Sequence, residues 1–176
     1  MKKVIIALLL LNISLLAYEV ENISVKFTAF KTYAKKGVNA TFDDVAYQKV
    51  SADTIVKMLT NSHVDINTAH VNSGNKARDA KLVTSFFNIQ DVKHIKAKII
   101  DVREKMLIVE IQMNETTLNI PMLYTVSDSS VLANGTIDLA DFMMIPSLKS
   151  INKACYDLHQ GKTWQDVDIS FEMDYK

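Results

Sequence analysis

The chain has 176 residues, with 20 basic and 20 acidic side chains and therefore no formal net charge. This length suits one domain with a sizeable core, and the charge balance argues against a dedicated nucleic-acid-binding protein. Four dispersed glycines exclude a glycine-rich phosphate loop, and the single cysteine, Cys155, excludes an intramolecular disulfide.

The first residues have the three-part order of a secretory signal peptide. A pair of lysines precedes an apolar run, and the small residue Ala17 ends it. The run is shorter than the roughly 20 apolar residues of a membrane span, which disfavours the alternative of an uncleaved anchor. We therefore predict a signal peptide over residues 1–17, cleavage near Ala17, and a mature domain over residues 18–176 in the periplasm or outside the cell.

Most of the mature chain shows the period-two alternation that is typical of half-buried antiparallel strands. The alternation is clearest at the C-terminus, where apolar Val167, Ile169 and Phe171 alternate with polar residues. Strands are expected over residues 23–28, 94–101, 105–113, 117–126, 131–140 and 166–175. About eight strands of this kind form either a sandwich or a closed barrel, and periodicity does not choose between them.

Three segments without this alternation are expected to be short helices, at residues 51–60, 76–87 and 147–160. Ser51 is placed to cap the first helix and Ser147 the last. The apolar side chains of the last helix fall on one stripe: Leu148, Ile151, Cys155 and Leu158. We expect this stripe to face the core.

The chain contains no motif that assigns a catalytic acid, base or nucleophile. Cys155 and His159 lie four residues apart on the last predicted helix, and the chain has eight methionines. A copper or redox site built from these groups is one alternative, and an enzyme that uses Asp138 or Asp141 is another. We predict no catalytic residue, no metal ligand and no cofactor.

The stretch from 64 to 89 resembles the signature of the YceI-like family of exported bacterial proteins. It keeps the order of a small-residue turn, an Arg-Asp pair, a leucine and a Phe-Phe pair, here Ser73-Gly74-Asn75, Arg78-Asp79, Leu82 and Phe86-Phe87. Gly37 and Phe42 fit the first hairpin of that family, and residues 161–173 resemble its closing passage into the last strand.

This resemblance implies a mainly β fold, an eight-stranded antiparallel lipocalin-like barrel with a few short helices. It implies a non-catalytic binding protein that holds a long apolar lipid, such as a polyisoprenoid, an isoprenoid quinone or a fatty amide. A bound lipid then takes the place of a cofactor. We expect the following residues to line the tunnel: Phe27, Phe42, Phe86, Phe87, Ile99, Val109, Ile111, Tyr124, Ile137, Phe142, Ile169 and Phe171. We expect Arg78 and Asp79 to fix the turn before their helix instead of contacting the ligand.

The expected partner is therefore a long-chain apolar small molecule, with transient contact to a membrane and none to nucleic acid. The oligomeric state is left open, and a dimer is compatible with the sequence. The alternative function is that of a metal- or redox-linked periplasmic protein that uses Cys155, His159 and the methionines.

Overall fold

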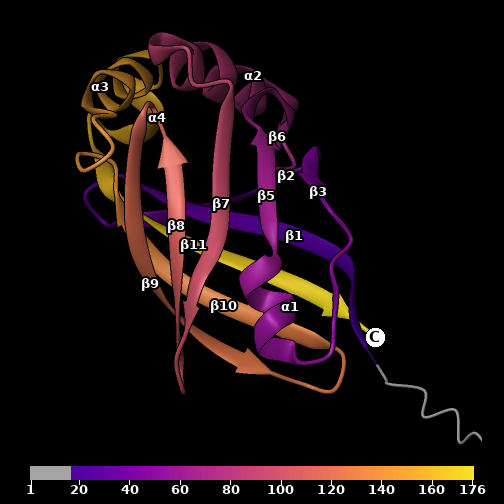
Figure 1. The fold of residues 1–176 in the computed structure, drawn as a ribbon. Helices are drawn as coiled ribbons and strands as arrows, with labels where there is room; N and C mark the ends of the chain where they lie inside the picture. The colour runs from indigo at the N-terminus through magenta and orange to yellow at the C-terminus, as the bar shows by residue number, and fades with distance from the viewer. Residues whose placement is uncertain (1–16) are drawn as a thin grey trace, which may run out of the picture.

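The computed structural model describes residues 17–176, so the predicted signal peptide lies outside the described residues except for Ala17. These residues form a curled antiparallel sheet with helices at its two ends (Figure 1). In this part of the chain, no helix is both long and apolar enough to cross a membrane.

All the strands in residues 17–176 belong to one 11-stranded sheet. They are β1 (Tyr18–Lys31), β2 (Lys36–Phe42), β3 (Val45–Tyr47), β4 (Ser51–Ala52), β5 (His63–Asn67), β6 (Val71–Asn72), β7 (His94–Val102), β8 (Met106–Met113), β9 (Thr116–Val126), β10 (Ser130–Asp138) and β11 (Thr163–Tyr175). The six strands predicted from alternation correspond to β1 and β7 to β11.

The strand count differs from the predicted eight because two long strands are kinked. β2 and β3 are separated at Asp43 and Asp44, and β5 and β6 by the 3-10 helix η1 (Thr68–His70). Backbone pairing continues across both kinks: the Asp43 amide donates to the carbonyl of His70 at 2.9 Å, and the Asn67 amide to that of Asp44 at 3.1 Å. With each kinked pair taken as one strand, and the two-residue β4 set aside, eight strands form a ring in which each pairs with two neighbours.

With the kinked pairs counted as single strands, the shortest ladder of the ring lies between β9 and β10. Their ladder joins residues 123–126 to residues 131–134 and stops before Pro121, which has no amide hydrogen to donate. Phe142, in the loop after β10, is fully buried. Its carbonyl accepts a hydrogen bond of 3.0 Å from the Asn114 side chain at the turn between β8 and β9.

Helices cover both ends of the curled sheet (Figure 1). They are α1 (Ile55–Asn61), α2 (Lys76–Ser85), the 3-10 helix η2 (Phe87–Gln90), α3 (Ile145–Ala154) and α4 (Tyr156–His159). α2, α3 and α4 gather at one end, and α1 lies toward the other, where it buries Met58 and Leu59.

The predicted helices are present, but the capping residues predicted for the first and the last helix were wrong. Thr54, not Ser51, caps α1 by accepting a hydrogen bond from the Lys57 amide at 3.3 Å. Ser147 lies inside α3, where its buried hydroxyl donates to the Gln90 side chain at 3.0 Å. This bond ties α3 to η2 instead of capping the helix.

The last predicted helix is broken into α3 and α4 at Cys155, whose backbone angles of −125° and 26° are not helical. The break rotates α4 relative to α3. Leu158 is therefore 65% exposed and does not continue the buried stripe, which was predicted to include it. Ile151 and Cys155 are buried as expected.

The turn before α2 is fixed by the Arg-Asp pair, as predicted. The Asp79 carboxylate accepts hydrogen bonds from the backbone amide of Ser73, at 2.8 Å, and from its hydroxyl. Arg78 donates to the hydroxyl and the carbonyl of the same serine, at 2.8 and 2.7 Å. Gly74 has a φ of 75°, which favours glycine at this position.

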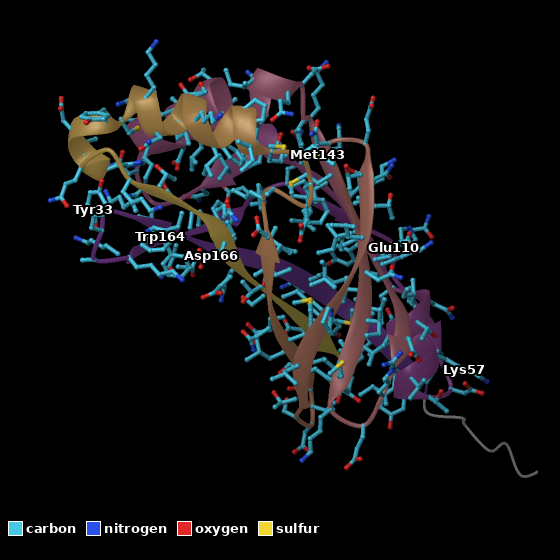
Figure 2. The ribbon with its side chains drawn as sticks, turned by 90° about the vertical axis from the view of Figure 1, so that its left-hand side faces the viewer. Tyr33, Lys57, Glu110, Met143, Trp164 and Asp166 are labelled. Carbon is cyan, nitrogen blue, oxygen red and sulfur yellow. The ribbon has the colours of Figure 1, made fainter. Side chains whose placement is uncertain are left out.

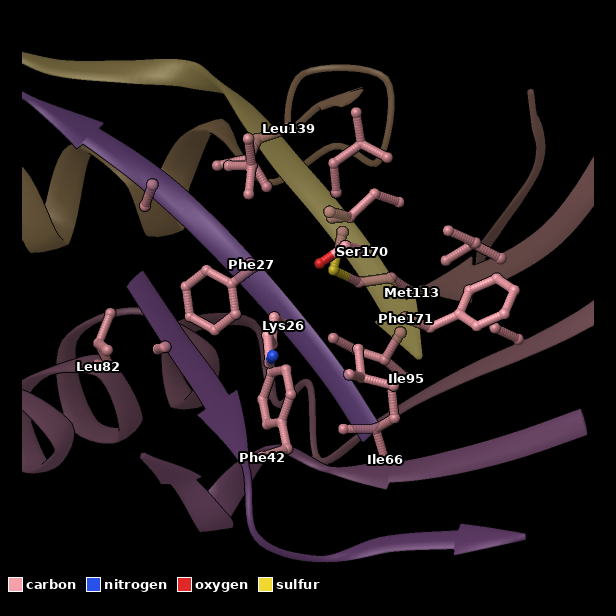
Figure 3. Close-up of a pocket in the computed structure, with 18 of the residues that line it drawn as sticks. Lys26, Phe27, Phe42, Ile66, Leu82, Ile95, Met113, Leu139, Ser170 and Phe171 are labelled. Carbon is pink, nitrogen blue, oxygen red and sulfur yellow. The ribbon is translucent and has the colours of Figure 1, made fainter. Parts of the chain in front are cut away.

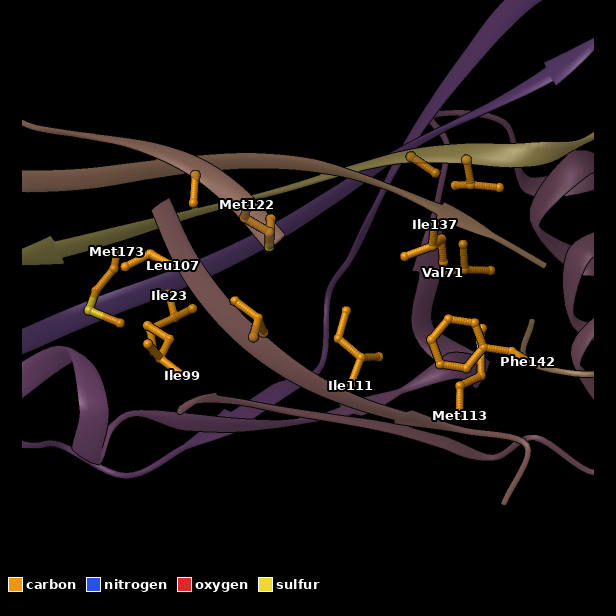
Figure 4. Close-up of a cluster of buried hydrophobic side chains, with 14 of the residues drawn as sticks. Ile23, Val71, Ile99, Leu107, Ile111, Met113, Met122, Ile137, Phe142 and Met173 are labelled. Atoms are coloured by element: carbon orange, nitrogen blue, oxygen red, sulfur yellow. The ribbon is translucent and has the colours of Figure 1, made fainter. Parts of the chain in front are cut away.

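The inward faces of the strands form the hydrophobic core (Figure 4). Leu107, Met122 and Met173 are almost completely buried toward the α1 end, and Phe142 packs near Met113 at the other. Between these packed ends the same faces surround a cavity.

We predict that Asp79→Ala lowers the free energy of unfolding by about 1–3 kcal/mol, because the two donors of Ser73 lose a charged acceptor. Chemical denaturation measures the loss. The matched control is Asp128→Ala in the exposed turn between β9 and β10, which should change stability by less than about 0.5 kcal/mol. Equal effects of the two changes would contradict the role given to Asp79.

Candidate functional site

A cavity of about 240 Å³ lies inside the curled sheet and is partly open to solvent. Its walls come from all eight long strands, and α2 and α3 cover one end. Figure 3 shows apolar side chains converging on it, among them Phe27, Phe42, Ile66, Ile95 and Phe171. The cavity is therefore lined mainly by apolar side chains.

Two neighbouring strands form one wall through their alternation. On β1 the residues Ile23, Val25, Phe27 and Ala29 face the cavity, and on β11 the residues Val167, Ile169, Phe171 and Met173 do so. The register places Phe27 beside Ile169 and Val25 beside Phe171. Because side chains alternate along a strand, this wall is continuous and apolar over four residues of each strand.

Four phenylalanine rings form a second, aromatic wall. Phe27 and Phe42 have ring centroids 5.5 Å apart, Phe42 and Phe87 6.3 Å, and Phe87 and Phe86 5.1 Å. α2 ends at Phe86, whose non-helical backbone directs the chain into η2. The Phe-Phe pair thereby carries the aromatic surface from the strands onto the covering helices.

Ten of the twelve residues predicted to line a tunnel border this cavity: Phe27, Phe42, Phe86, Phe87, Ile99, Val109, Ile111, Ile137, Ile169 and Phe171. Tyr124 and Phe142 do not border it. Tyr124 lies near the far end of β9, where its hydroxyl donates to the Arg103 carbonyl at 3.0 Å. Phe142 is fully buried in solid core. That the other ten contact a ligand stays a prediction.

Sequence reasoning missed the contribution of the helices and of smaller side chains. Leu82, Leu148 and Ile151 reach the cavity from α2 and α3, and Val25 and Ala29 from β1. The period-two alternation of β1 already indicated that Val25 and Ala29 face the same side as Phe27. The apolar stripe of Leu148, Ile151 and Cys155 carried the signal for α3, but it was assigned to the core and not to a ligand.

Polar side chains border the cavity where α2, α4 and the ends of β1 and β11 meet. They include Lys31, Arg78, Lys81 and His159. Arg78 was expected to fix its turn without facing the ligand, and it both fixes the turn and lines the cavity. The indole of Trp164 lies at the same place and donates to the Thr32 carbonyl at 2.8 Å.

His159 is held by a short hydrogen-bond chain. Its Nδ1 lies 3.0 Å from the hydroxyl of Thr163, which donates to the Asn152 side chain at 3.0 Å. Because this hydroxyl has used its hydrogen, Nδ1 is the donor to it. Burial first, and then the charges of Lys31 and Lys81, lower the pKa of His159 from its ordinary value of 6.5.

Cys155 and His159 both border the cavity, and the His159 amide donates to the Cys155 carbonyl at 2.9 Å. The thiol belongs to a residue that is buried at the end of α3. Within residues 17–176, no group of three or more His, Cys, Asp or Glu side chains is placed to hold a metal ion.

The profile of the YceI-like domain matches residues 18–175. The chain belongs to the YceI-like family. None of the curated protein sequences matches it. The predicted family and the mainly β, lipocalin-like fold are thus confirmed.

Solved structures share this YceI-like fold at low sequence identity. A polyisoprenoid-binding domain from Saccharophagus degradans, implicated in plant cell wall breakdown, has a TM-score of 0.63 at 11% identity, over 90% of this chain and 97% of that one. BcnA of Burkholderia cenocepacia has a TM-score of 0.57 at 10% identity, over 86% and 95%. A YceI protein of Campylobacter jejuni has a TM-score of 0.58 at 15% identity, over 80% and 86%.

We predict that His159 makes the fold less stable as the pH falls. The unfolded imidazole titrates near 6.5 and the folded one at lower pH, so between the two pKa values the unfolded chain binds more protons. The contribution to stability is complete above pH 6.5 and is lost as the pH falls through the folded pKa.

Chemical denaturation at about pH 5 and about pH 8 measures this effect. His159→Gln should show a smaller difference between the two pH values than the unchanged protein. The control is His63→Gln, at an exposed site on β5. An unchanged difference in His159→Gln would refute the assignment.

Proposed function

We propose that this protein is a non-catalytic carrier that holds one long apolar chain inside the curled sheet. The observation that carries the proposal is the cavity itself, which is lined by aliphatic and aromatic side chains over its length. A similar fold belongs to a protein described as a polyisoprenoid-binding domain. The ligand class is therefore a long lipid such as a polyisoprenoid, an isoprenoid quinone or a fatty amide.

The physical basis of binding is removal of the chain from water. Burial contributes about 25 cal/mol for each Å² of apolar surface, or about 0.8 kcal/mol for each methylene group. A ring of eight strands is just wide enough to surround one slender molecule. Met113, Met122 and Met173 border the cavity, and their flexible thioethers suit chains of slightly different shape.

We further propose that the carrier works outside the cytoplasm, after export and removal of residues 1–17. The basis is the order of two lysines, an apolar run and Ala17 in the sequence. A lipid that moves through water between membranes needs such an enclosure.

Transient contact with a membrane fits the surface around the polar end of the cavity. Tyr33, Tyr156 and Leu158 are 74, 63 and 65% exposed there. The turn of Tyr33 joins the segment that follows α4 through a 3.0 Å hydrogen bond from the Thr32 amide to the Lys162 carbonyl. Figure 2 shows Tyr33 near Trp164 at this end of the molecule. Exposed tyrosine and leucine beside lysines favour the interface of a bilayer.

We predict that Ile111→Trp reduces the amount of bound lipid while the melting temperature of the lipid-free protein stays nearly unchanged. Ile111 is buried on the cavity side of β8, so an indole can take up volume that the lipid otherwise occupies. In solid core the same change costs typically about 1–3 kcal/mol through overpacking.

The control is Ile108→Trp, on the opposite face of the same strand and outside the cavity lining. It should keep its full lipid content. The measurements are thermal melting and the ratio of lipid to protein. Unchanged lipid together with a large loss of stability in Ile111→Trp would contradict a ligand at this position.

A further inference from the structure

The charged side chains that line the cavity all carry the same sign. Each of the five is a lysine or an arginine: Lys26, Lys31, Arg78, Lys81 and Lys98. Within residues 17–176, no aspartate or glutamate belongs to the lining. The whole chain has equal numbers of acidic and basic residues, so its composition does not explain this selection.

Lys31 occupies an unexpected position on β1. It follows the apolar residues Ile23, Val25, Phe27 and Ala29 at alternate positions of β1 that line the cavity. A lysine there places its charge at the end of the apolar wall. Lys98, in contrast, is already paired with Glu110 at 3.0 Å on the outside of the sheet.

Two further cations reach the same end of the cavity from α2. Arg78 and Lys81 lie three residues apart and therefore share one face of the helix. The Nζ of Lys81 donates to the Ala154 carbonyl at 3.3 Å, and the hydrogen bonds of Arg78 hold its guanidinium on Ser73. Within residues 17–176, none of the three side chains of Lys31, Arg78 and Lys81 forms an ion pair with an aspartate or a glutamate.

We propose that Lys31, Arg78 and Lys81 bind the anionic head group of the molecule whose chain fills the cavity. The preferred ligand is then a single-chain amphiphile that ends in a carboxylate or a phosphate. This inference rests on the proposed carrier function and specifies the ligand class of the same site.

The arrangement favours an anion for two physical reasons. Lys31 and Lys81 both place positive charge near His159 and have no carboxylate partner in residues 17–176, so an anion there is stabilised by their charges. The apolar walls also exclude water, which strengthens charge-assisted hydrogen bonds to a head group. The direction of the His159 pKa agrees with this, because Lys31 and Lys81 both disfavour a further positive charge at this place.

Matched ligands with the same chain and different head groups test the proposal. Oleate and oleyl alcohol form one pair, and farnesyl phosphate and farnesol form the other, each used below its aggregation concentration with delipidated protein. Trp164 is the only tryptophan and borders the polar end of the cavity, so its fluorescence reports binding there. We expect the anion to bind roughly tenfold more tightly than the alcohol in at least one pair.

Variants of two neighbouring lysines separate a specific contact from general charge. Lys31 and Lys36 are register partners in the hairpin of β1 and β2, but only Lys31 lines the cavity. Lys31→Met should lose most of the preference for the anion and keep the affinity for the alcohol. Lys36→Met removes the same charge and should keep the preference. Lys81→Met is a second test variant in case Lys31→Met does not fold.

Each outcome decides between the claims. A preference for oleate alone assigns a carboxylate, and one for farnesyl phosphate alone assigns a phosphate; both support the inference. Equal affinity within both pairs, or an equal loss in Lys36→Met, overturns it and leaves the carrier function standing. Absence of binding by all four ligands would instead overturn the carrier function on which it rests.

Discussion

Closure of the sheet through its kinked strands is the constraint on which the cavity depends. The pair β2/β3 meets the pair β5/β6, and hydrogen bonds across Asp43 and Asp44 keep the ladder continuous where the chain bends. Without that ladder the inward apolar face would meet water. With it, eight strands enclose one space that α1 fills at one end and α2 and α3 cover at the other.

The sequence predicted the strands well because their signal is local. In β8 and β11 each buried residue alternates with a more exposed one, and the pattern alone gives the direction of every side chain. The positions of the kinks and of the helix ends were not predicted, because neighbouring residues are equally suited to end a helix and the packing of the whole fold decides between them. Thr54 and Ser51 are both good capping residues, and the break at Cys155 that exposes Leu158 follows from packing at the end of the sheet.

In the candidate site, too, local patterns were predicted and the effects of packing were not. Alternation finds inward-facing residues, but it does not distinguish those that border an empty space from those that pack solid core, and Phe142 belongs to the core. Because only apolar residues were chosen as candidates for the lining, the inward-facing Lys31 was left out. Only the structure, which brings β1, α2 and β11 together, shows that Lys31 lines the cavity. It also shows that the cavity has an apolar part and a cationic end.

Native mass spectrometry of the protein, purified without detergent, tests the enclosure of a lipid most directly. The account predicts a mass excess that corresponds to one long-chain molecule per protein chain, and organic extraction should remove this excess. A protein that carries no excess mass, and that takes up nothing from a bacterial lipid extract after delipidation, would contradict the account.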